Sequence, residues 1–368
     1  MSLTAGIVGL PNVGKSTLFN AITKSNALSA NYPFATIEPN VGVVLVPDQR
    51  LDVLNKMYNP KSLVATTFEF TDIAGLVKGA SKGEGLGNQF LDNIRKCDAI
   101  VQVIRTFDDE NITHVDGSVD PIRDLETINL ELIFADLETV EKRLPKIEHQ
   151  AKSNMGNARE EYALLLRIKE VLMAGKLLSK EDFTKDEVKA IKSYNFLTMK
   201  KMLLVANIKE DDILDPMANK HYKALYDYSQ ENDFEVIPIC AQVEADLVDF
   251  SDEEKQEYLE ALGISQTGLE SLIVASYSLL NLETFFTAGE KEVRAWTFKR
   301  GMKAPECAGI IHTDFEKGFI KAEVVSYDEL VKDGSLLEAK QKGHVRQEGK
   351  EYVFQDGDVV LFKFNVTK

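Results

Sequence analysis

The sequence has few cysteines, and their spacing is not that of a disulfide framework or a metal site. The chain of 368 residues contains three, Cys97, Cys240 and Cys307, which lie far apart and are odd in number. They form neither a disulfide framework nor a Cys-x-x-Cys metal pattern, which suits a reducing compartment. We therefore expect each to be a small buried hydrophobic residue and not a nucleophile.

A long apolar run is also missing. No stretch approaches the ~18 apolar residues that a membrane-spanning helix needs. The N-terminus runs directly into a strand pattern, which leaves no room for a leader peptide. These absences exclude a membrane partner and predict a cytoplasmic protein.

Positive charge is in deficit. Lys and Arg number 43 against 59 Asp and Glu, which gives a net charge of −16. This balance excludes a protein that coats nucleic acid with its whole surface, and we expect no DNA partner, while a local basic face for RNA stays open. The length predicts two or three domains.

The strongest motif lies near the start of the chain. Residues 9–16 read Gly-Leu-Pro-Asn-Val-Gly-Lys-Ser and fit the phosphate-binding P-loop. The apolar run 5–8 predicts a buried strand before it, and residues 18–22 have helical spacing after it. In this order backbone amides and a helix N-terminus surround phosphate oxygens, Lys15 reaches the β- and γ-phosphates, and the Ser16 hydroxyl holds Mg²⁺. The chain is therefore predicted to bind a nucleoside triphosphate.

Two further motifs are typical of nucleotide switch proteins. Thr36 stands in a loop after the P-loop helix and is our candidate second ligand of Mg²⁺, with an ordinary loop threonine as the alternative. Residues 66–75 form a β-rich run that ends in Asp72-x-x-Gly75. A carboxylate at the end of such a strand orients Mg²⁺ through water, and the Gly75 amide is placed to donate to the γ-phosphate.

The group that orients the attacking water is not obvious. Ras-like GTPases have a glutamine after this glycine, whereas Leu76 can neither donate nor accept a hydrogen bond. We therefore expect slow hydrolysis until a partner or another group positions the water. His114, in the polar loop 108–117, is a candidate, with a solvated loop histidine as the alternative. The glycine-rich run 78–87 predicts a mobile switch loop.

A long helical pattern interrupts the alternation of strands and helices. Apolar residues recur at three- and four-residue steps over 122–147, a turn is expected near 151–157, and returning helices are expected over 158–175 and 185–200. We predict an inserted helical coiled-coil hairpin at about 122–200, where a minimal nucleotide domain needs one crossover helix. Its basic residues form either a contact face or an ordinary solvated surface: Lys142, Arg143, Lys146, Lys152 and Arg159.

The strand pattern at 202–206 leads into an altered base-recognition motif. GTPases have Asn-Lys-x-Asp there and use the aspartate to read guanine, whereas this chain has Asn207-Ile208-Lys209-Glu210. The displaced lysine and the longer acid predict that guanine recognition is lost or relaxed, and that backbone groups around Ile208 read adenine instead. From about residue 279, short apolar runs predict a small β-rich domain without a catalytic constellation.

With these motifs assembled, the chain resembles the YchF / Obg-like ATPase family of Obg-related P-loop proteins over essentially its full length. The other specific markers are residues 72–77 (Asp-Ile-Ala-Gly-Leu-Val) and 295–301 (Ala-Trp-Thr-Phe-Lys-Arg-Gly), the latter similar to the signature of the family's β-grasp (TGS) domain. The resemblance implies an α/β P-loop NTPase of G-domain type over 1–278, mainly parallel in its sheet and carrying the helical insertion. A TGS domain over 279–368 follows.

The resemblance also implies Mg²⁺-dependent hydrolysis of ATP, often of GTP as well, and association with the ribosome, its large subunit included, or with RNA. His114 matches a histidine proposed in the family to replace the missing glutamine, so His114 and Lys15 are the catalytic candidates. Asn12 matches the asparagine of potassium-stimulated relatives, which adds K⁺ as an activator. The nucleotide-binding candidates are Asn12, Val13, Gly14, Lys15, Ser16, Thr17, Asp72, Gly75, Asn207, Ile208 and Glu210, and the metal ligands are Ser16 and Thr36.

Two alternatives to an ATPase stay open at this point. In the first, Glu210 does the work of the aspartate and the enzyme is a GTPase. In the second, the protein is a nucleotide-gated module that docks onto the ribosome or RNA, and hydrolysis is secondary.

Overall fold

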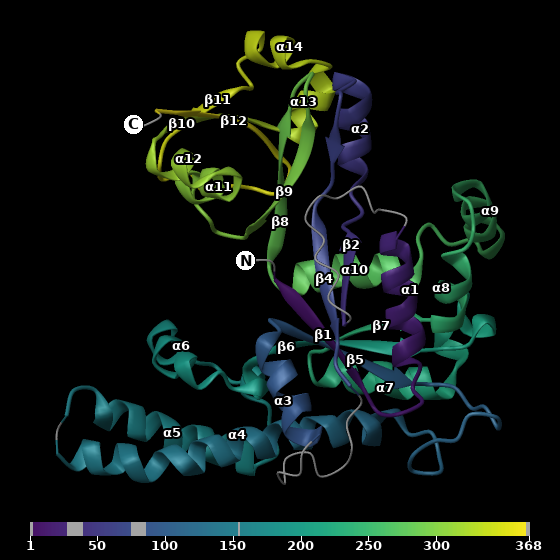
Figure 1. Cartoon of the computed structure of the whole chain (residues 1–368), viewed down its shortest axis with the longest axis vertical. Helices are drawn as coiled ribbons and strands as arrows, with labels where there is room; N and C mark the ends of the chain where they lie inside the picture. The colour runs from purple at the N-terminus through teal and green to yellow at the C-terminus, as the bar shows by residue number, and fades with distance from the viewer. Residues whose placement is uncertain (1–2, 28–39, 75–85, 154, 366–368) are drawn as a thin grey trace. The chain divides into compact units, whose positions relative to one another are not determined.

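The computed structural model describes residues 3–27, 40–74, 86–153 and 155–365 (Figure 1). The chain divides into two compact units. The first combines residues 1–44 with 69–272, and the second combines residues 45–68 with 273–368. Within the described residues, each unit contains one six-stranded sheet.

The sheet of the first unit is parallel in all of its recorded pairings. Its strand order is β2-β4-β1-β5-β6-β7, and parallel pairs join β1 to β4 and β5, β5 to β6, and β6 to β7. A parallel sheet covered on both faces needs strands that are apolar throughout, and every residue of β5 is buried. The strands are β1 (Thr4–Gly9), β2 (Val41–Leu45), β4 (Thr67–Asp72), β5 (Ala99–Arg105), β6 (Lys201–Asn207) and β7 (Glu235–Ile239).

This topology gathers the predicted motifs at one edge of the sheet. The P-loop follows β1, Asp72 ends β4, the loop with His114 follows β5, and Asn207 ends β6. Because the carboxyl ends of parallel strands meet at the same edge, ligands of such sheets bind there. The predicted α/β P-loop fold is confirmed.

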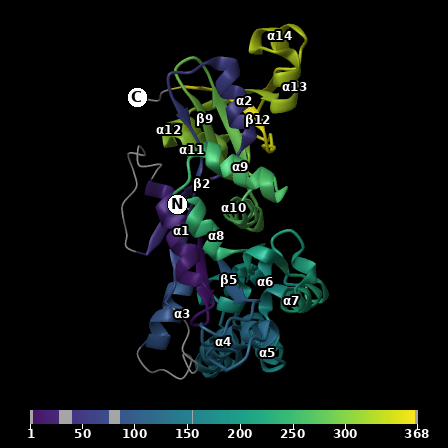
Figure 2. The same cartoon turned by 90° about the vertical axis from the view of Figure 1, so that its right-hand side faces the viewer.

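Two pairs of helices in the first unit contact each other. Helix α1 (Lys15–Ala27) lies beside α8 (Ala241–Leu247), as Figures 1 and 2 show, and α4 (Pro121–Lys152) contacts α7 (Lys220–Glu231). The remaining elements around this sheet are α3 (Leu86–Lys96), η5 (Glu210–Asp212), η6 (Pro216–Ala218) and α9 (Asp252–Leu262), and α10 (Gly268–Leu279) leads into the second unit.

The predicted helical hairpin is confirmed. Helices α4 and α5 (Ala158–Met173) pack side by side (Figure 1). Asp120 caps α4 by accepting a hydrogen bond from the Arg123 amide, and Pro121 stands in the first turn, where its missing N–H costs nothing. The predicted apolar seam is mostly buried, and its buried members are Leu125, Ile128, Leu132, Val140 and Ile147.

The return from the hairpin is anchored on α4. After η2 (Leu178–Lys180), α6 (Lys185–Ile191) and η3 (Lys192–Tyr194), the chain reaches η4 (Leu197–Met199). The buried Asp136 carboxylate accepts hydrogen bonds from the Leu197 amide at 2.9 Å, the Thr198 amide at 2.8 Å and the Thr198 hydroxyl at 2.7 Å. Burial raises the pKa of Asp136, although these hydrogen bonds favour its charged form. The insertion is thereby tied back to α4 just before β6 begins.

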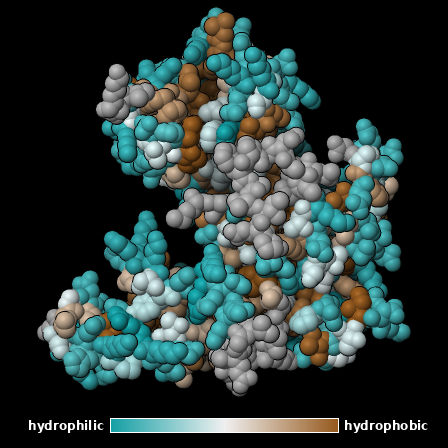
Figure 3. Space-filling model, viewed as in Figure 1, coloured by the Kyte–Doolittle hydropathy of each residue, from teal (hydrophilic) through white to brown (hydrophobic). Residues whose placement is uncertain are grey.

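Three of the five basic residues singled out in the hairpin are paired with neighbouring acids. Lys142 pairs with Glu138 at 2.5 Å, Lys152 with Glu148 at 2.7 Å, and Arg143 with Glu161 at 3.0 Å. On the face seen in Figure 3 the hairpin is predominantly hydrophilic. Of the two interpretations left open by the sequence, an ordinary solvated surface therefore fits the described contacts better than a basic contact face.

The second unit has a mixed sheet in the order β11-β10-β12-β8-β9-β3. Phenylalanine rings form the centre of its core, with the Phe285 ring centroid 5.3 Å from that of Phe354 and 6.1 Å from that of Phe362. Its strands are β3 (Leu63–Val64), β8 (Leu282–Ala288), β9 (Val293–Lys299), β10 (Phe319–Ser326), β11 (Arg346–Glu348) and β12 (Asp358–Phe364), and its helices are α2 (Gln49–Tyr58), α11 (Ala304–Ile311), α12 (Thr313–Lys317), α13 (Tyr327–Asp333) and α14 (Leu336–Gln341).

This unit differs from the expected division at residues 278 and 279, because it includes residues 45–68. Leu51 and Leu54 of α2 belong to a buried cluster with Phe286 and Val293, and β3 pairs with β9. These contacts join segments that are more than two hundred residues apart. Local sequence patterns do not report contacts between such distant segments, so the sequence-based prediction assigned residues 45–68 to the nucleotide domain.

None of the described helices is long and apolar enough to cross a bilayer. All three cysteines are buried and outside disulfides, as predicted, and burial raises the pKa of each thiol. Their thiolate forms are disfavoured, so none has the character of a nucleophile.

Candidate functional site

The P-loop adopts a backbone that requires its particular residues. Asn12 and Gly14 have φ values of 63° and 93°, in the left-handed region that favours glycine and tolerates asparagine. A Cβ on Gly14 would lie 2.1 Å from Asn207 Nδ2, so a side chain there would displace Asn207. The Leu18 amide donates to the Gly14 carbonyl at 3.0 Å and starts the ladder of α1.

Lys15 and Asp72 are paired at the edge of the sheet. The Lys15 ammonium, at the start of α1, donates to the carboxylate at the end of β4. Lys15 is buried, whereas the Asp72 side chain is partly exposed. The lysine that would meet phosphate oxygens thus has its charge balanced by an acid that would itself lie near the metal.

The donor set beside the P-loop fits Mg²⁺. Ser16 is exposed in the first turn of α1, and the Asp72 carboxylate accepts a hydrogen bond from Lys15, the residue before Ser16. Hydroxyl and carboxylate oxygens are the hard ligands that Mg²⁺ prefers. Thr36, Gly75 and Leu76 lie outside the described residues, so the predictions that rest on them stay predictions.

Asn207 connects three segments of the site. Its Nδ2 donates to the Val13 carbonyl at 2.9 Å, and its Oδ1 accepts from the Ala241 amide at 3.0 Å. Its own carbonyl accepts from the amide and the hydroxyl of Thr106. One buried side chain therefore joins the P-loop to the start of α8, that is, the predicted phosphate-binding segment to the predicted base-binding segment.

A cavity of about 400 Å³ lies between these segments. This volume is within the range of ordinary small-ligand sites, ~300–1,000 Å³. Its walls come from the P-loop, the loop after β5, the segment after β6 and the start of α8: Asn12, Gly14, Thr17, Phe107, Asp109, Ile112, Asn207, Ile208, Lys209, Glu210, Asp211, Cys240, Ala241, Gln242 and Val243. The predicted base-reading residues Asn207, Ile208 and Glu210 are thus brought together with Asn12, Gly14 and Thr17.

Two of the predicted base-reading groups are engaged within the protein. The Ile208 amide donates to the Ile239 carbonyl at 2.9 Å, so this N–H does not face a base. The Glu210 carboxylate accepts from the Tyr258 hydroxyl at 2.8 Å. Burial and this hydrogen bond raise the pKa of Tyr258 to about 12. Tyr258, on α9, is a partner of Glu210 that the sequence did not reveal.

His114 is buried, unlike the solvated loop histidine that the sequence allowed. Its Nε2 lies 2.8 Å from Asp124 Oδ2, and its Nδ1 accepts from the Asp116 amide at 3.1 Å. The Arg123 guanidinium lies 3.1 Å from Asp124 Oδ1 and 3.7 Å from Asp116 Oδ2, so an internal cation balances these acids. Both ring nitrogens are occupied in this conformation, and neither is placed to orient a water molecule.

Arg105 was missed by the sequence analysis and holds the loop after β5 in shape. Its buried guanidinium donates to the carbonyls of Phe107 and Ile112, each at 2.9 Å, and of Asp109 at 3.2 Å. Asn12 Nδ2 donates to the Thr113 carbonyl at 3.1 Å and joins this loop to the P-loop. The sequence does show a charged residue at the end of a mostly apolar strand, which could have marked Arg105. It does not show which backbone carbonyls this residue binds.

Glu244, near the base-side cavity, gives a pH-dependent stability. Burial raises its pKa from 4.5 to about 7, against the hydrogen bond that it accepts from the Gly268 amide at 2.8 Å. Between these two pH values the unfolded chain has lost the proton that folded Glu244 keeps, so the contribution of Glu244 to stability falls as pH rises and is constant above about 7. Over this pH range we expect the free energy of unfolding of the Glu244→Gln variant to fall by about 3 kcal/mol less than that of the wild type. Urea unfolding across this pH range measures it, with the exposed Glu257→Gln as control; equal slopes in wild type and Glu244→Gln would contradict it.

The chain matches two families of known proteins. Residues 4–136 match the family described as 50S ribosome-binding GTPase, and residues 282–365 match the YchF-GTPase C-terminal family, described as a protein of unknown function. The chain is 58% identical over 366 residues to the ribosome-binding ATPase YchF of Bacillus subtilis and 48% identical over 366 residues to that of Escherichia coli O157:H7, covering 100% of both chains in each case. It also matches the solved structure of the Schizosaccharomyces pombe YchF GTPase with a TM-score of 0.90, 42% identity and 98% coverage of each chain.

Proposed function

The chain belongs to the YchF family, and from this premise we propose that it hydrolyses ATP to ADP and phosphate and acts as a ribosome-associated switch. The observation that carries the proposal is the P-loop edge of the sheet, where Lys15 is buried against Asp72 beside a cavity of nucleotide size. The relatives are named ribosome-binding ATPase in two bacteria and GTPase in a yeast, so the names disagree about the base.

The reaction that we propose is in-line attack of water on the γ-phosphate. Lys15 leaves Asp72 for the phosphate oxygens, and the P-loop amides stabilise the negative charge that spreads over them in the transition state. Ser16 and Thr36 would hold Mg²⁺, which supplies further neutralisation of the phosphate charge when it is bound. K⁺ activation through Asn12 is part of the proposal and rests on the match to potassium-stimulated relatives.

His114 is the water-orienting group in this proposal, and it must leave its contact with Asp124 to act. The ring is engaged at both nitrogens in the resting conformation. Catalytic hydrogen bonds often form only in the substrate complex, so this resting arrangement is compatible with the role. It supports slow hydrolysis by the isolated protein and stimulation by a partner that shifts the loop after β5.

Nucleotide preference tests the proposal first. We expect labelled ATP to bind more tightly than GTP with Mg²⁺ present, because Glu210 is held by Tyr258 and the lysine of the GTPase motif is displaced. Glu210→Asp restores the shorter acid and loses the tyrosine contact, so it should shift the ATP-to-GTP affinity ratio toward GTP by about tenfold, the effect of one hydrogen bond to a charged group.

The control for this experiment is Asp215→Asn, which changes an exposed acid just before η6 that does not line the cavity. It should leave the ratio unchanged. A clear GTP preference of the unchanged protein would mean that Glu210 reads guanine, and the protein would then be a GTPase.

A second candidate function is a nucleotide-gated ribosome-binding module. The engaged state of His114 favours it, because an enzyme at rest in this conformation lacks its water-orienting group. Sedimentation of wild type and Lys15→Ala with ribosomes, with and without ATP, separates the two. Binding that follows nucleotide occupancy while hydrolysis is absent would support the module.

A further inference from the structure

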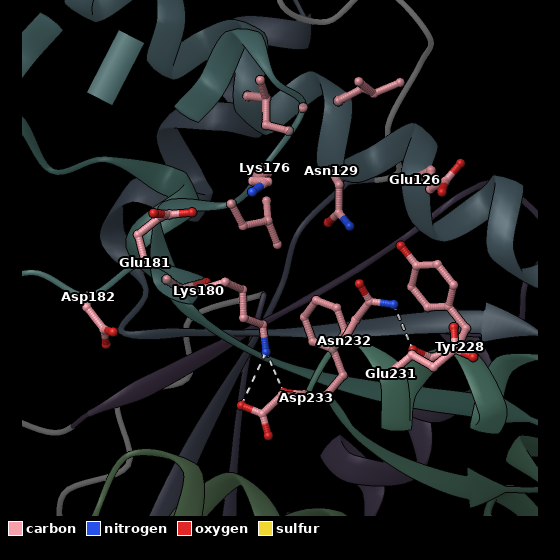
Figure 4. Close-up of a pocket in the computed structure, with 16 residues that line it drawn as sticks. Glu126, Asn129, Lys176, Lys180, Glu181, Asp182, Tyr228, Glu231, Asn232 and Asp233 are labelled. Atoms are coloured by element: carbon pink, nitrogen blue, oxygen red, sulfur yellow. Dashed lines mark hydrogen bonds and ion pairs between the residues drawn. The ribbon is translucent and has the colours of Figure 1, made fainter. Parts of the chain in front are cut away.

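A second cavity, of about 780 Å³, lies in the first unit and shares no lining residue with the nucleotide cavity. Three segments surround it: the early turns of α4, residues 175–182 after α5, and the end of α7 with the residues before β7 (Figure 4). Its volume falls in the range of ligand sites, ~300–1,000 Å³. The charges and surfaces of these segments indicate which ligand chemistry it fits.

The cavity carries an excess of negative charge. Four carboxylates line it without an ion pair or side-chain hydrogen bond to any other described residue: Glu126, Glu181, Asp182 and Glu231. Lys180 does not balance them, because its ammonium donates to the Asp233 carbonyl, lies 3.8 Å from Asp233 Oδ2 and sits 4.1 Å from the centre of the Phe234 ring. Only Lys176 offers a further cation among the lining residues.

A buried acceptor points into the same cavity. Asn129 is 9% exposed, and its Oδ1 has no hydrogen-bond partner among the residues described. Figure 4 shows its amide projecting from α4 into the space opposite Asn232. Buried side-chain carbonyls ordinarily have a hydrogen-bond partner, so this oxygen is an acceptor that an N–H donor entering the cavity could satisfy.

The floor of the cavity is apolar. Ile133, Leu177 and Phe234 are buried there, and Leu130 is 44% exposed on α4. Lysine and arginine place their aliphatic stems along such surfaces while their charged ends reach acids. The acids come from three separate chain segments, so several cationic groups spaced along one molecule match them better than a single one.

We propose that this cavity is the docking site for a short basic segment of a partner polypeptide. A backbone or side-chain N–H of the segment bonds Asn129 Oδ1, its lysine and arginine stems lie on the apolar floor, and their heads pair with the surrounding carboxylates. The site does not use the nucleotide-binding residues, so it stands independently of the proposed ATPase activity.

Fluorescence anisotropy of a fluorescein-labelled hexapeptide, Arg-Leu-Lys-Gly-Arg-Lys, with the full chain tests this. We expect saturable binding that weakens with salt, and no binding of the peptide in which glutamate replaces each basic residue. The combined Asn129→Leu and Glu231→Gln variant should weaken binding at least about tenfold, because it removes the acceptor and one charge. Glu253→Gln, an exposed acid on α9, is the matched control and should change nothing.

Because a buried substitution can disturb folding, Glu126→Lys provides a second test on an exposed residue of the rim. It should weaken peptide binding more than the loss of a single charge does, while ATP hydrolysis is unchanged. The proposal is overturned if the peptide does not bind, if these variants bind it as well as wild type does, or if spermidine binds in a variant-sensitive way while the peptide does not.

Discussion

Replacing Lys15 with alanine is expected to lower the turnover number for ATP about a thousandfold, the upper range for loss of one group that stabilises transition-state charge. The ammonium is the cation that the P-loop presents to the phosphates, and its removal also leaves the Asp72 carboxylate without its partner at the position where Mg²⁺ would bind. The measurement is phosphate release at saturating ATP, because binding and turnover must be separated.

Lys24→Ala is the matched control for this variant, since Lys24 lies on the same helix and its side chain is 57% exposed, 3.6 Å from Asp249. It should retain wild-type turnover. Circular dichroism and thermal unfolding of both variants exclude a folding defect. A Lys15→Ala enzyme within tenfold of wild type would show that another group stabilises the phosphate charge.

Replacing His114 with alanine is expected to lower turnover about a hundredfold and leave ATP affinity nearly unchanged. The ring lies on the loop after β5, which borders the nucleotide cavity and is joined to the P-loop through Asn12. An effect on turnover alone would mark a group that acts in the transition state and does not hold the substrate. Single-turnover kinetics with bound ATP is the direct measurement.

His221→Ala is a sharp control because His221 also contacts an acid of this loop, with Nε2 3.1 Å from Asp108 Oδ2. Both histidines fasten the loop, but only His114 is proposed to meet water. Equal losses in the two variants would assign His114 to the structure of the loop and would remove it from the reaction.

The fold was predictable because its signals are local. The P-loop pattern carries its own strand and helix, and the apolar runs 5–8 and 202–206 lie in β1 and β6. The hairpin followed from three- and four-residue spacing over 122–147. These features depend on residues close in sequence, so a pattern is enough to find them.

Parts of the site were not predictable because they depend on long-range contacts. Asn207 was selected as a base-reading residue, yet its amide bonds Val13 and Ala241, which lie in distant segments. The partner of Glu210 is Tyr258, and the partner of His114 is Asp124; neither pair has a spacing that a motif records. The role of Arg105 could not be predicted either, because it binds backbone carbonyls, which every residue possesses.

The make-up of the second unit, which combines an early and a late segment of the chain, determines when this unit can fold during synthesis. Leu51 and Leu54 emerge early, yet the cluster that buries them includes Phe286, Val293 and Val359. At roughly 5–20 residues per second, these partners follow tens of seconds later. During that interval the apolar face of α2 lacks the residues that bury it in the folded protein. The core of the second unit can therefore form only when translation is nearly finished. A fragment of residues 279–368 alone would lack that face altogether and should be poorly soluble, whereas appending residues 45–68 should restore it.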